Sequence, residues 1–192
     1  MADAGRLAHD LSELALATPW FRRALTAVGR LGLESWAVGA GAVRNLVWDH
    51  LHGYATPSHL ADLDVAYFDP QDLTAESEAR LRATLVADCP DLPWEVTNQA
   101  SVHLWYAQAF GYAVPALTSL EAAIATWPET ATSVAITIEP DGTPRIIAPC
   151  GLEDLFAMIV RRNPTRVSLE WYRQRIATKR YAERWPRVTI VP

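Results

Sequence analysis

The sequence predicts an α/β (α+β) fold, and three observations support this prediction. Short apolar stretches typical of strands alternate with longer stretches whose apolar residues recur every three or four positions, as on one face of a helix. The chain has 192 residues, 50% of them hydrophobic, which is enough to enclose a substantial core. No apolar run approaches the ~18 residues of a membrane span. We therefore expect one main domain and no membrane partner.

In the first half of the chain, caps and breakers delimit the elements. Thr18 is placed to cap a helix that has Pro19 at its first position, and Gly32 ends that helix. Thr74 begins a helix whose first turn is acidic, where negative charge suits the helix dipole. Helices are expected over residues 6–17, 18–31, 42–52 and 74–86, and strands over 35–38, 63–68 and 92–97.

In the second half, Asn98 is expected to cap the next helix, and Pro140-Asp141-Gly142 indicates a hairpin. The strands of this hairpin are expected over residues 134–138 and 145–148, and further helices over 119–126, 151–162 and 165–184. The sequence contains no internal repeat and no low-complexity segment.

A glycine turn followed by two aspartates is the most informative feature. The turn and the helix that it opens supply four candidate nucleotide-binding residues: Gly39, Gly41, Arg44 and Asn45. Asp62 and Asp64 follow in a strand, where residues two apart point to the same face. Two carboxylates so close repel each other, and a divalent cation between them would relieve the repulsion. Because a helix N-terminus offers N–H groups to phosphate oxygens, the combination indicates magnesium-dependent phosphate chemistry.

Other glycine-rich motifs explain this stretch less well. A glycine pair after a strand also begins the dinucleotide-binding fingerprint, and Asp62 lies about the right distance downstream for a ribose ligand. However, Arg44 replaces the third glycine of that fingerprint, and the aspartate pair stays unexplained. A P-loop is excluded because the chain lacks Gly-Lys-Ser/Thr.

The glycine turn and the Asp-x-Asp pair resemble those of the polymerase-beta-type nucleotidyltransferase superfamily, which includes the tRNA CCA-adding enzymes. More closely, roughly residues 15–187 resemble a poorly characterised group of bacterial nucleotidyltransferase-like proteins. The closer resemblance depends on three further parts of the sequence: residues 94–99 with 102–106, residues 149–156, and Trp185-Pro186.

This resemblance implies a small mixed sheet with flanking helices, and it implies roles for individual residues. Asp62, Asp64 and a third carboxylate, for which Glu95 is the candidate and Asp69 the next choice, would be catalytic and would bind two Mg²⁺ ions, with Mn²⁺ as a substitute. The protein would transfer a nucleoside monophosphate from an NTP to an unidentified acceptor and release pyrophosphate. The alternative is a non-catalytic nucleotide- or partner-binding module of the same fold.

The role of Arg44 stays open between two interpretations. Its position matches the arginine that follows the turn in the superfamily, where it could contact a phosphate. It could equally form a structural salt bridge with an acidic neighbour.

Charge divides the chain into an acidic body and a basic end. Residues 161–192 hold nine basic and two acidic side chains, a balance of +7, which leaves −12 for residues 1–160. We divide the chain into an N-terminal helix (1–17), a nucleotidyltransferase core (18–148) and a basic helical C-terminal part (149–192) packed on that core. The basic charge could bind triphosphate or RNA, or it could pair with the acidic body.

An arginine stripe on the last helix favours RNA as the acceptor. Arg166, Arg173 and Arg180 recur every seven residues and would fall along one face, while Leu169, Tyr172 and Ile176 would dock the helix on the body. Trp171 and Trp185 could stack on bases or belong to the core.

The cysteines and the N-terminus indicate the compartment. Cys89 and Cys150 fit no metal-ligand spacing, and the first residues lack the features of a signal peptide. We expect two reduced thiols in a cytoplasmic protein.

Overall fold

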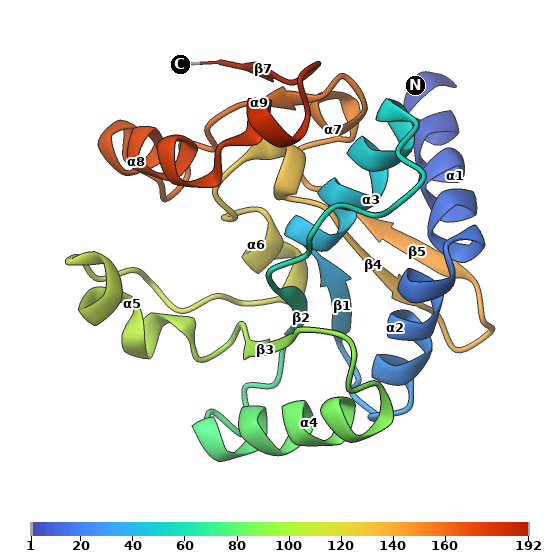
Figure 1. Ribbon diagram of the computed structural model, residues 1–192. Coiled ribbons are helices and arrows are strands. Elements are labelled where there is room, and N and C mark those ends of the chain that lie inside the picture. Colours follow the sequence, from blue (N-terminus) through green and yellow to red (C-terminus); the bar gives the residue numbers. More distant parts are fainter. Residues whose placement is uncertain (1, 192) are drawn as a thin grey trace.

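The computed structural model describes residues 2–191 and contains a five-stranded mixed sheet (Figure 1). Its strands are β1 (Trp36–Gly39), β2 (Leu63–Tyr67), β3 (Trp94–Asn98), β4 (Ala135–Ile138) and β5 (Pro144–Ile147), in the spatial order β3-β2-β1-β4-β5. The pairing of β2 with β3 is parallel, whereas the other three pairings are antiparallel. The expected α/β fold with a small mixed sheet is therefore confirmed.

Helices flank this sheet on both sides. They are α1 (Ala2–Ala17), α2 (Pro19–Gly29), α3 (Gly41–His52), α4 (Ala75–Asp88), α5 (Val102–Phe110), α6 (Leu120–Ile124), α7 (Glu153–Phe156), α8 (Leu169–Lys179) and α9 (Tyr181–Arg184), with a 3-10 turn η1 (Thr130–Thr132). In Figure 1, α1 and α2 lie on one side of the molecule, and α5 and α8 lie on the other. None of the described helices is long and apolar enough to cross a membrane.

One hydrophobic core includes side chains from the N-terminal helix, the sheet region and the C-terminal segment. Leu11, Trp48, Tyr172 and Trp185 are all fully buried in it. Trp185 packs edge-on against Trp48 with ring centroids 5.2 Å apart, and its indole N–H donates to Asp49 Oδ1 at 2.7 Å. Trp185 is therefore a core residue and is not available to stack on a base.

The helix expected over residues 151–162 is wrong beyond its first turn. The helix α7 ends at Phe156, Met158 has a left-handed φ of 56°, and the chain continues as strand β6 (Ile159–Val160). Strand β6 pairs in parallel with β7 (Thr189–Ile190), about thirty residues further along. This distant partner, which local periodicity cannot reveal, explains why apolar residues here form a strand.

The arginine stripe is also wrong, because the expected helix over residues 165–184 is shorter and interrupted. The Ser168 side chain caps α8 by accepting from the Trp171 N–H at 3.2 Å, so Arg166 precedes the helix. Arg180 has a φ of 49° and ends α8, and its guanidinium pairs with Glu183. Arg166 and Arg180 thus do not share a helical face with Arg173.

Asn98 does not cap α5 as expected. The cap position is Ser101, and the Asn98 side chain instead ties the end of β3 to the loop after β2. Its amide donates to the carbonyl oxygens of Asp69 and Asp72 at 2.7 and 2.9 Å, and its oxygen accepts from the Asp69 N–H. These bonds hold the two strands that carry the acidic residues together at their C-terminal ends.

Candidate active site

The carboxylates meet on neighbouring strands. The parallel register of β2 and β3 places Asp64 directly opposite Glu95, so both side chains lie on the same face of the sheet. Asp62 comes immediately before β2, two residues from Asp64, and shares that face. Asp62 and Asp64 are half-buried and Glu95 is exposed. The register therefore brings together the three acidic residues that the sequence singled out.

Asp64 is the carboxylate of this group whose pKa is shifted most clearly. Burial, with the added repulsion of Asp62 and Glu95, raises the pKa of the Asp64 carboxyl from 3.8 to about 7. Lys179 and the backbone N–H of Gly41 act in the opposite direction but do not cancel the effect. Among the described residues, neither Asp62 nor Asp64 has a basic partner at ion-pair distance.

The glycine turn delivers the N-terminus of α3 to these carboxylates. A Cβ atom at Gly39 would lie 2.7 Å from the Ala135 Cβ and 2.8 Å from the Trp127 ring, so close packing requires glycine there. At Gly41 a Cβ would lie 3.6 Å from both Arg44 Nη2 and Asp62 Oδ1, which places the turn between these two groups. Ala40 has a φ of 50°, a conformation strained for any residue with a side chain. No side chain of the described residues caps α3. The Gly41 N–H already bonds to Asp64, which leaves the other N–H groups of the first turn for an anion.

Arg44 is held by aromatic rings. Its guanidinium carbon lies 5.0 to 5.6 Å from the ring centroids of Trp48, Tyr181 and Trp185. The side chain is only 4% exposed, and Nη2 donates to Asn45 Oδ1 at 2.7 Å. Within the described part of the chain it forms no ion pair with a carboxylate, so the salt-bridge interpretation of Arg44 is wrong. Its Nε is buried and has no hydrogen-bond partner among the residues that the structure describes.

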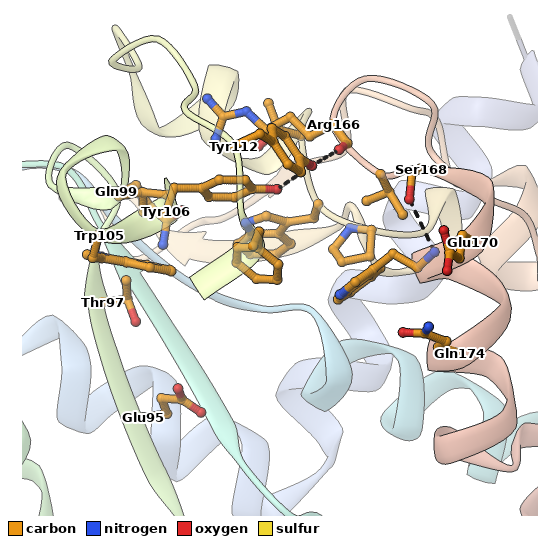
Figure 2. Close-up of a pocket in the computed structure, with 17 residues that line it drawn as sticks. Glu95, Thr97, Gln99, Trp105, Tyr106, Tyr112, Arg166, Ser168, Glu170 and Gln174 are labelled. Carbon is orange, nitrogen blue, oxygen red and sulfur yellow. Dashed lines mark hydrogen bonds between the residues drawn. The ribbon is translucent and has the colours of Figure 1, made fainter. Parts of the chain in front are cut away.

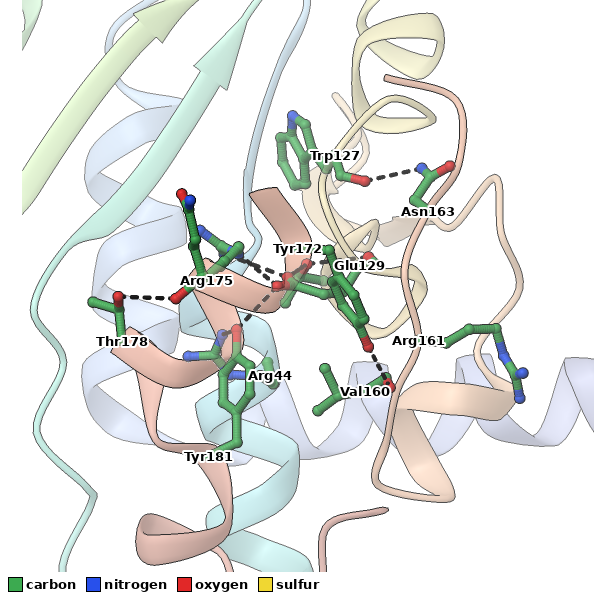
Figure 3. A network of polar contacts seen from close by, with 12 residues as sticks. Arg44, Trp127, Glu129, Val160, Arg161, Asn163, Tyr172, Arg175, Thr178 and Tyr181 are labelled. Atoms are coloured by element: carbon green, nitrogen blue, oxygen red, sulfur yellow. Dashed lines mark hydrogen bonds and ion pairs between the residues drawn. The ribbon is translucent and has the colours of Figure 1, made fainter. Parts of the chain in front are cut away.

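A buried polar network positions α8 over the site (Figure 3). Glu129 is 1% exposed, and the Arg175 Nε–H donates to its Oε1 at 2.5 Å. The hydroxyls of Tyr181 and Thr132 donate to the same carboxylate at 3.2 and 2.7 Å. Although burial opposes it, Arg175 holds the pKa of the Glu129 carboxyl below its usual value. Sequence analysis missed this network, because Glu129 and Arg175 lie 46 residues apart.

These elements enclose a cavity of about 220 Å³ that brings both signs of charge together. Its charged lining residues are Arg44, Asp62, Asp64, Arg175 and Lys179. Lys179 follows Arg175 by one helical turn and is the only lysine of the chain. The presence of a single lysine among sixteen arginines was the sequence feature that could have marked Lys179 as a candidate site residue. Gly39 and Asn45 do not line the cavity, and Asn45 instead holds Arg44.

The acidic side chains suit a hard divalent cation, although they are not arranged as a complete metal site. Among the described residues, no group of three or more His, Cys, Asp or Glu side chains lies in position to bind an ion. Carboxylate oxygens are the ligands that Mg²⁺ prefers, and Mg²⁺ usually keeps water in its remaining positions. Burial first, and then the repulsion of Asp62 and Glu95, raises the pKa of Asp64, and a bound cation would oppose both effects.

Comparison with known proteins identifies the family. A family model described as nucleotidyltransferase matches residues 26–190, and the chain therefore belongs to this nucleotidyltransferase family. The match covers both the carboxylate strands and the C-terminal helices. The sequence matches no curated protein.

Similar solved structures contain the same fold. One is a protein whose NMR structure reveals a CCA-adding enzyme head domain, with 28% sequence identity, 95% of each chain covered and a TM-score of 0.80. The Thermotoga maritima CCA-adding enzyme in complex with tRNA shares 14% identity over 96% of this chain, with a TM-score of 0.58. A CCA-adding enzyme in complex with CTP shares 13% identity over 98% of this chain, with a TM-score of 0.57. The chain spans only 42% and 43% of these two longer enzymes, and at such identities the likeness shows the fold alone.

Proposed function

We propose that this nucleotidyltransferase transfers a nucleoside monophosphate from a magnesium-bound NTP to an acceptor hydroxyl or phosphate. The main support is the β2–β3 register, which places Asp64 opposite Glu95, close to the N-terminus of α3, where the N-cap residue makes no side-chain hydrogen bond. In the reaction, an acceptor oxygen attacks the α-phosphorus and forms a new P–O bond. The bond from the α-phosphorus to the bridging oxygen breaks, pyrophosphate leaves with the electron pair, and the proton of a hydroxyl acceptor passes to water.

The residues divide the work between two ends of the site. The N–H groups of the first turn of α3 other than that of Gly41 suit the triphosphate, together with the side chains of Arg44, Arg175 and Lys179. The unpartnered Nε of Arg44 supports this assignment, since a buried donor without a partner is unfavourable unless a ligand satisfies it.

Asp62, Asp64 and Glu95 would hold Mg²⁺, with Mn²⁺ as a substitute. Bound metal would acidify the acceptor hydroxyl and stabilise the departing pyrophosphate. Asp62 and Asp64 line the cavity that would hold the triphosphate, whereas Glu95 lies on the neighbouring strand outside that cavity, and we assign it to the acceptor side.

RNA is the acceptor that we favour, now on different grounds from the arginine stripe. The stripe gives no support, because most arginines of the C-terminal part already have partners within the protein. For example, Arg175 pairs with Glu129, Arg161 pairs with Asp154, and Arg187 donates to the Leu51 carbonyl. The tRNA-bound relative of the same fold makes RNA a reasonable acceptor class to test first.

Pyrophosphate release from each of the four NTPs, with Mg²⁺ and fractionated cellular RNA, tests this function. We expect turnover that Asp62→Ala reduces at least about 100-fold, the magnitude typical for loss of one group that stabilises the transition state electrostatically. Glu95→Gln should reduce turnover while leaving NTP binding nearly unchanged. Glu76→Gln, an exposed carboxylate on α4, is the matched control and should retain full activity.

Two outcomes would contradict the proposal. If Mg²⁺·NTP raises the melting temperature but no acceptor supports turnover, the protein is a non-catalytic nucleotide-binding module. If Asp62→Ala retains more than about a tenth of the activity, a loss below ~1.4 kcal/mol of barrier, the carboxylates do not bind the catalytic metals.

A further inference from the structure

An aromatic groove lies beside the candidate active site, between α5 and α8 (Figure 2). Its volume is about 490 Å³, more than twice that of the carboxylate cavity. Six aromatic side chains line it: Trp105, Tyr106, Phe110, Tyr112, Trp127 and Trp171. The function proposed above does not use any of these rings.

The groove adjoins the candidate active site. Thr97, Gln99, Trp127 and Pro128 line both spaces, so a molecule bound in the groove would lie beside the carboxylate cavity. Glu95 lines the groove and not the carboxylate cavity. The groove therefore includes Glu95, whereas the cations that would hold a triphosphate line the carboxylate cavity.

The rings of the groove are held in place although they are open to solvent. Trp105 and Tyr112 remain 40% and 43% exposed. Phe110 packs edge-on against Trp171 with centroids 5.8 Å apart, which connects α5 to α8. The Arg166 guanidinium lies 5.5 Å from the centroid of the Tyr106 ring. Large rings fixed in this way but left exposed are suited to stacking against a planar ligand.

Charge limits what this ligand can be. The charged lining residues are Glu95, Glu170 and Arg166, and Arg166 also donates to the Pro115 carbonyl at 3.2 Å. One partly engaged cation beside two carboxylates cannot neutralise a run of phosphates. The groove therefore suits bases rather than a long nucleic-acid backbone, while Gln99 and Gln174 offer amides for hydrogen bonds to base edges.

We propose that the groove binds the unpaired terminal nucleoside of a single-stranded RNA acceptor, with its base stacked on the rings of α5 and α8. This inference rests on the proposed function, because it assigns the groove to the acceptor of that reaction. The base in the groove would leave the terminal ribose next to Glu95, where its hydroxyl can meet the α-phosphate.

Fluorescence anisotropy with a labelled single-stranded RNA hexamer of mixed sequence, without nucleotide, tests the groove directly. We expect Trp105→Ala to weaken binding about 5- to 150-fold, the range for losing one base–aromatic stack. Leu104→Ala is the matched control, because Leu104 is 61% exposed on the same helix and does not line the groove. Phe110→Ala is a second variant in the same wall, and melting curves establish that each variant is folded.

Two further binding measurements identify the ligand. Binding should fall by no more than about one log unit per tenfold increase in salt, since few phosphates are contacted, and a blunt RNA duplex should bind at least tenfold more weakly. Equal RNA affinity of Trp105→Ala and Leu104→Ala would overturn the proposal. So would equal binding of the duplex, or a Trp105→Ala variant that loses affinity for Mg²⁺·NTP but not for RNA, which would assign the groove to the base of the incoming nucleotide.

The outcome is separable from that of the proposed function. Turnover of NTPs without binding of the hexamer would refute the groove alone. If the wild-type protein shows neither stabilisation by nucleotide nor turnover, the proposed function is refuted, whatever the groove binds.

Discussion

Replacing Asp64 by asparagine should stabilise the metal-free protein at high pH. Burial and the neighbouring carboxylates raise the pKa of Asp64 from 3.8 to about 7 in the folded state. Between these values the folded chain holds a proton that the unfolded chain has lost, so stability falls as pH rises through this window. The penalty is absent below about pH 4 and complete above about pH 7. Asparagine keeps the size of the side chain and removes the charge.

The magnitude follows from the difference between the two pKa values. Each pKa unit corresponds to about 1.4 kcal/mol, so the ionised Asp64 carboxyl destabilises the folded state by at most about 4 kcal/mol. Asp64 is only half-buried, and solvent screening reduces such energies, so we expect about 1–2 kcal/mol. For a chain of this length, this corresponds to a rise in melting temperature of about 2–8 °C at pH 8.

The assay is thermal unfolding of both proteins at pH 4 and pH 8 in the presence of EDTA. Asp64→Asn should melt well above the wild type at pH 8, and the difference should nearly vanish at pH 4, because the penalty on the ionised carboxyl is lost there and other titrating groups are common to both proteins. Added Mg²⁺ should then stabilise the wild type at pH 8 more than the variant. A difference that is absent at pH 8, or the same at both pH values, would refute the electrostatic reasoning.

Two other substitutions test the cationic side of the site. Lys179→Met should weaken Mg²⁺·NTP binding about 10- to 100-fold, which corresponds to the loss of one hydrogen bond to a charged group. Isothermal titration calorimetry measures this change. Lys179→Arg should recover part of the affinity, and the control Arg173→Met, which changes an exposed residue of the same helix, should bind normally. Glu129→Gln should lower the free energy of unfolding by at most about 3–5 kcal/mol, because it leaves the half-buried Arg175 without its buried counter-charge. Chemical denaturation measures this change, and a loss below about 1 kcal/mol would show that the network of Figure 3 does not hold α8 in place.

Local sequence patterns were sufficient for most of the sheet and for one half of the site. The strand–turn–helix at residues 36–52 and the strand after Asp62 follow from apolar spacing and glycine placement, which act between near neighbours. The spacing of Asp62 and Asp64 also placed them on one face without any knowledge of the fold. Where a partner lay far along the chain, the same patterns failed, as for the helix expected over 151–162 that became strand β6 beside β7.

By itself, then, the sequence determined the fold class, the acidic pair and the turn beside it, because residues a few positions apart share a face through backbone geometry alone. Only the tertiary structure decided that Glu95 stands opposite Asp64, that Lys179 enters the cavity, and that α5 and α8 face each other across an aromatic groove. It also showed that four C-terminal arginines contact the body rather than forming a stripe: Arg166, Arg175, Arg184 and Arg187. Composition records how many charges and rings a chain has, whereas their pairing depends on contacts between residues tens of positions apart, which form only when the core closes.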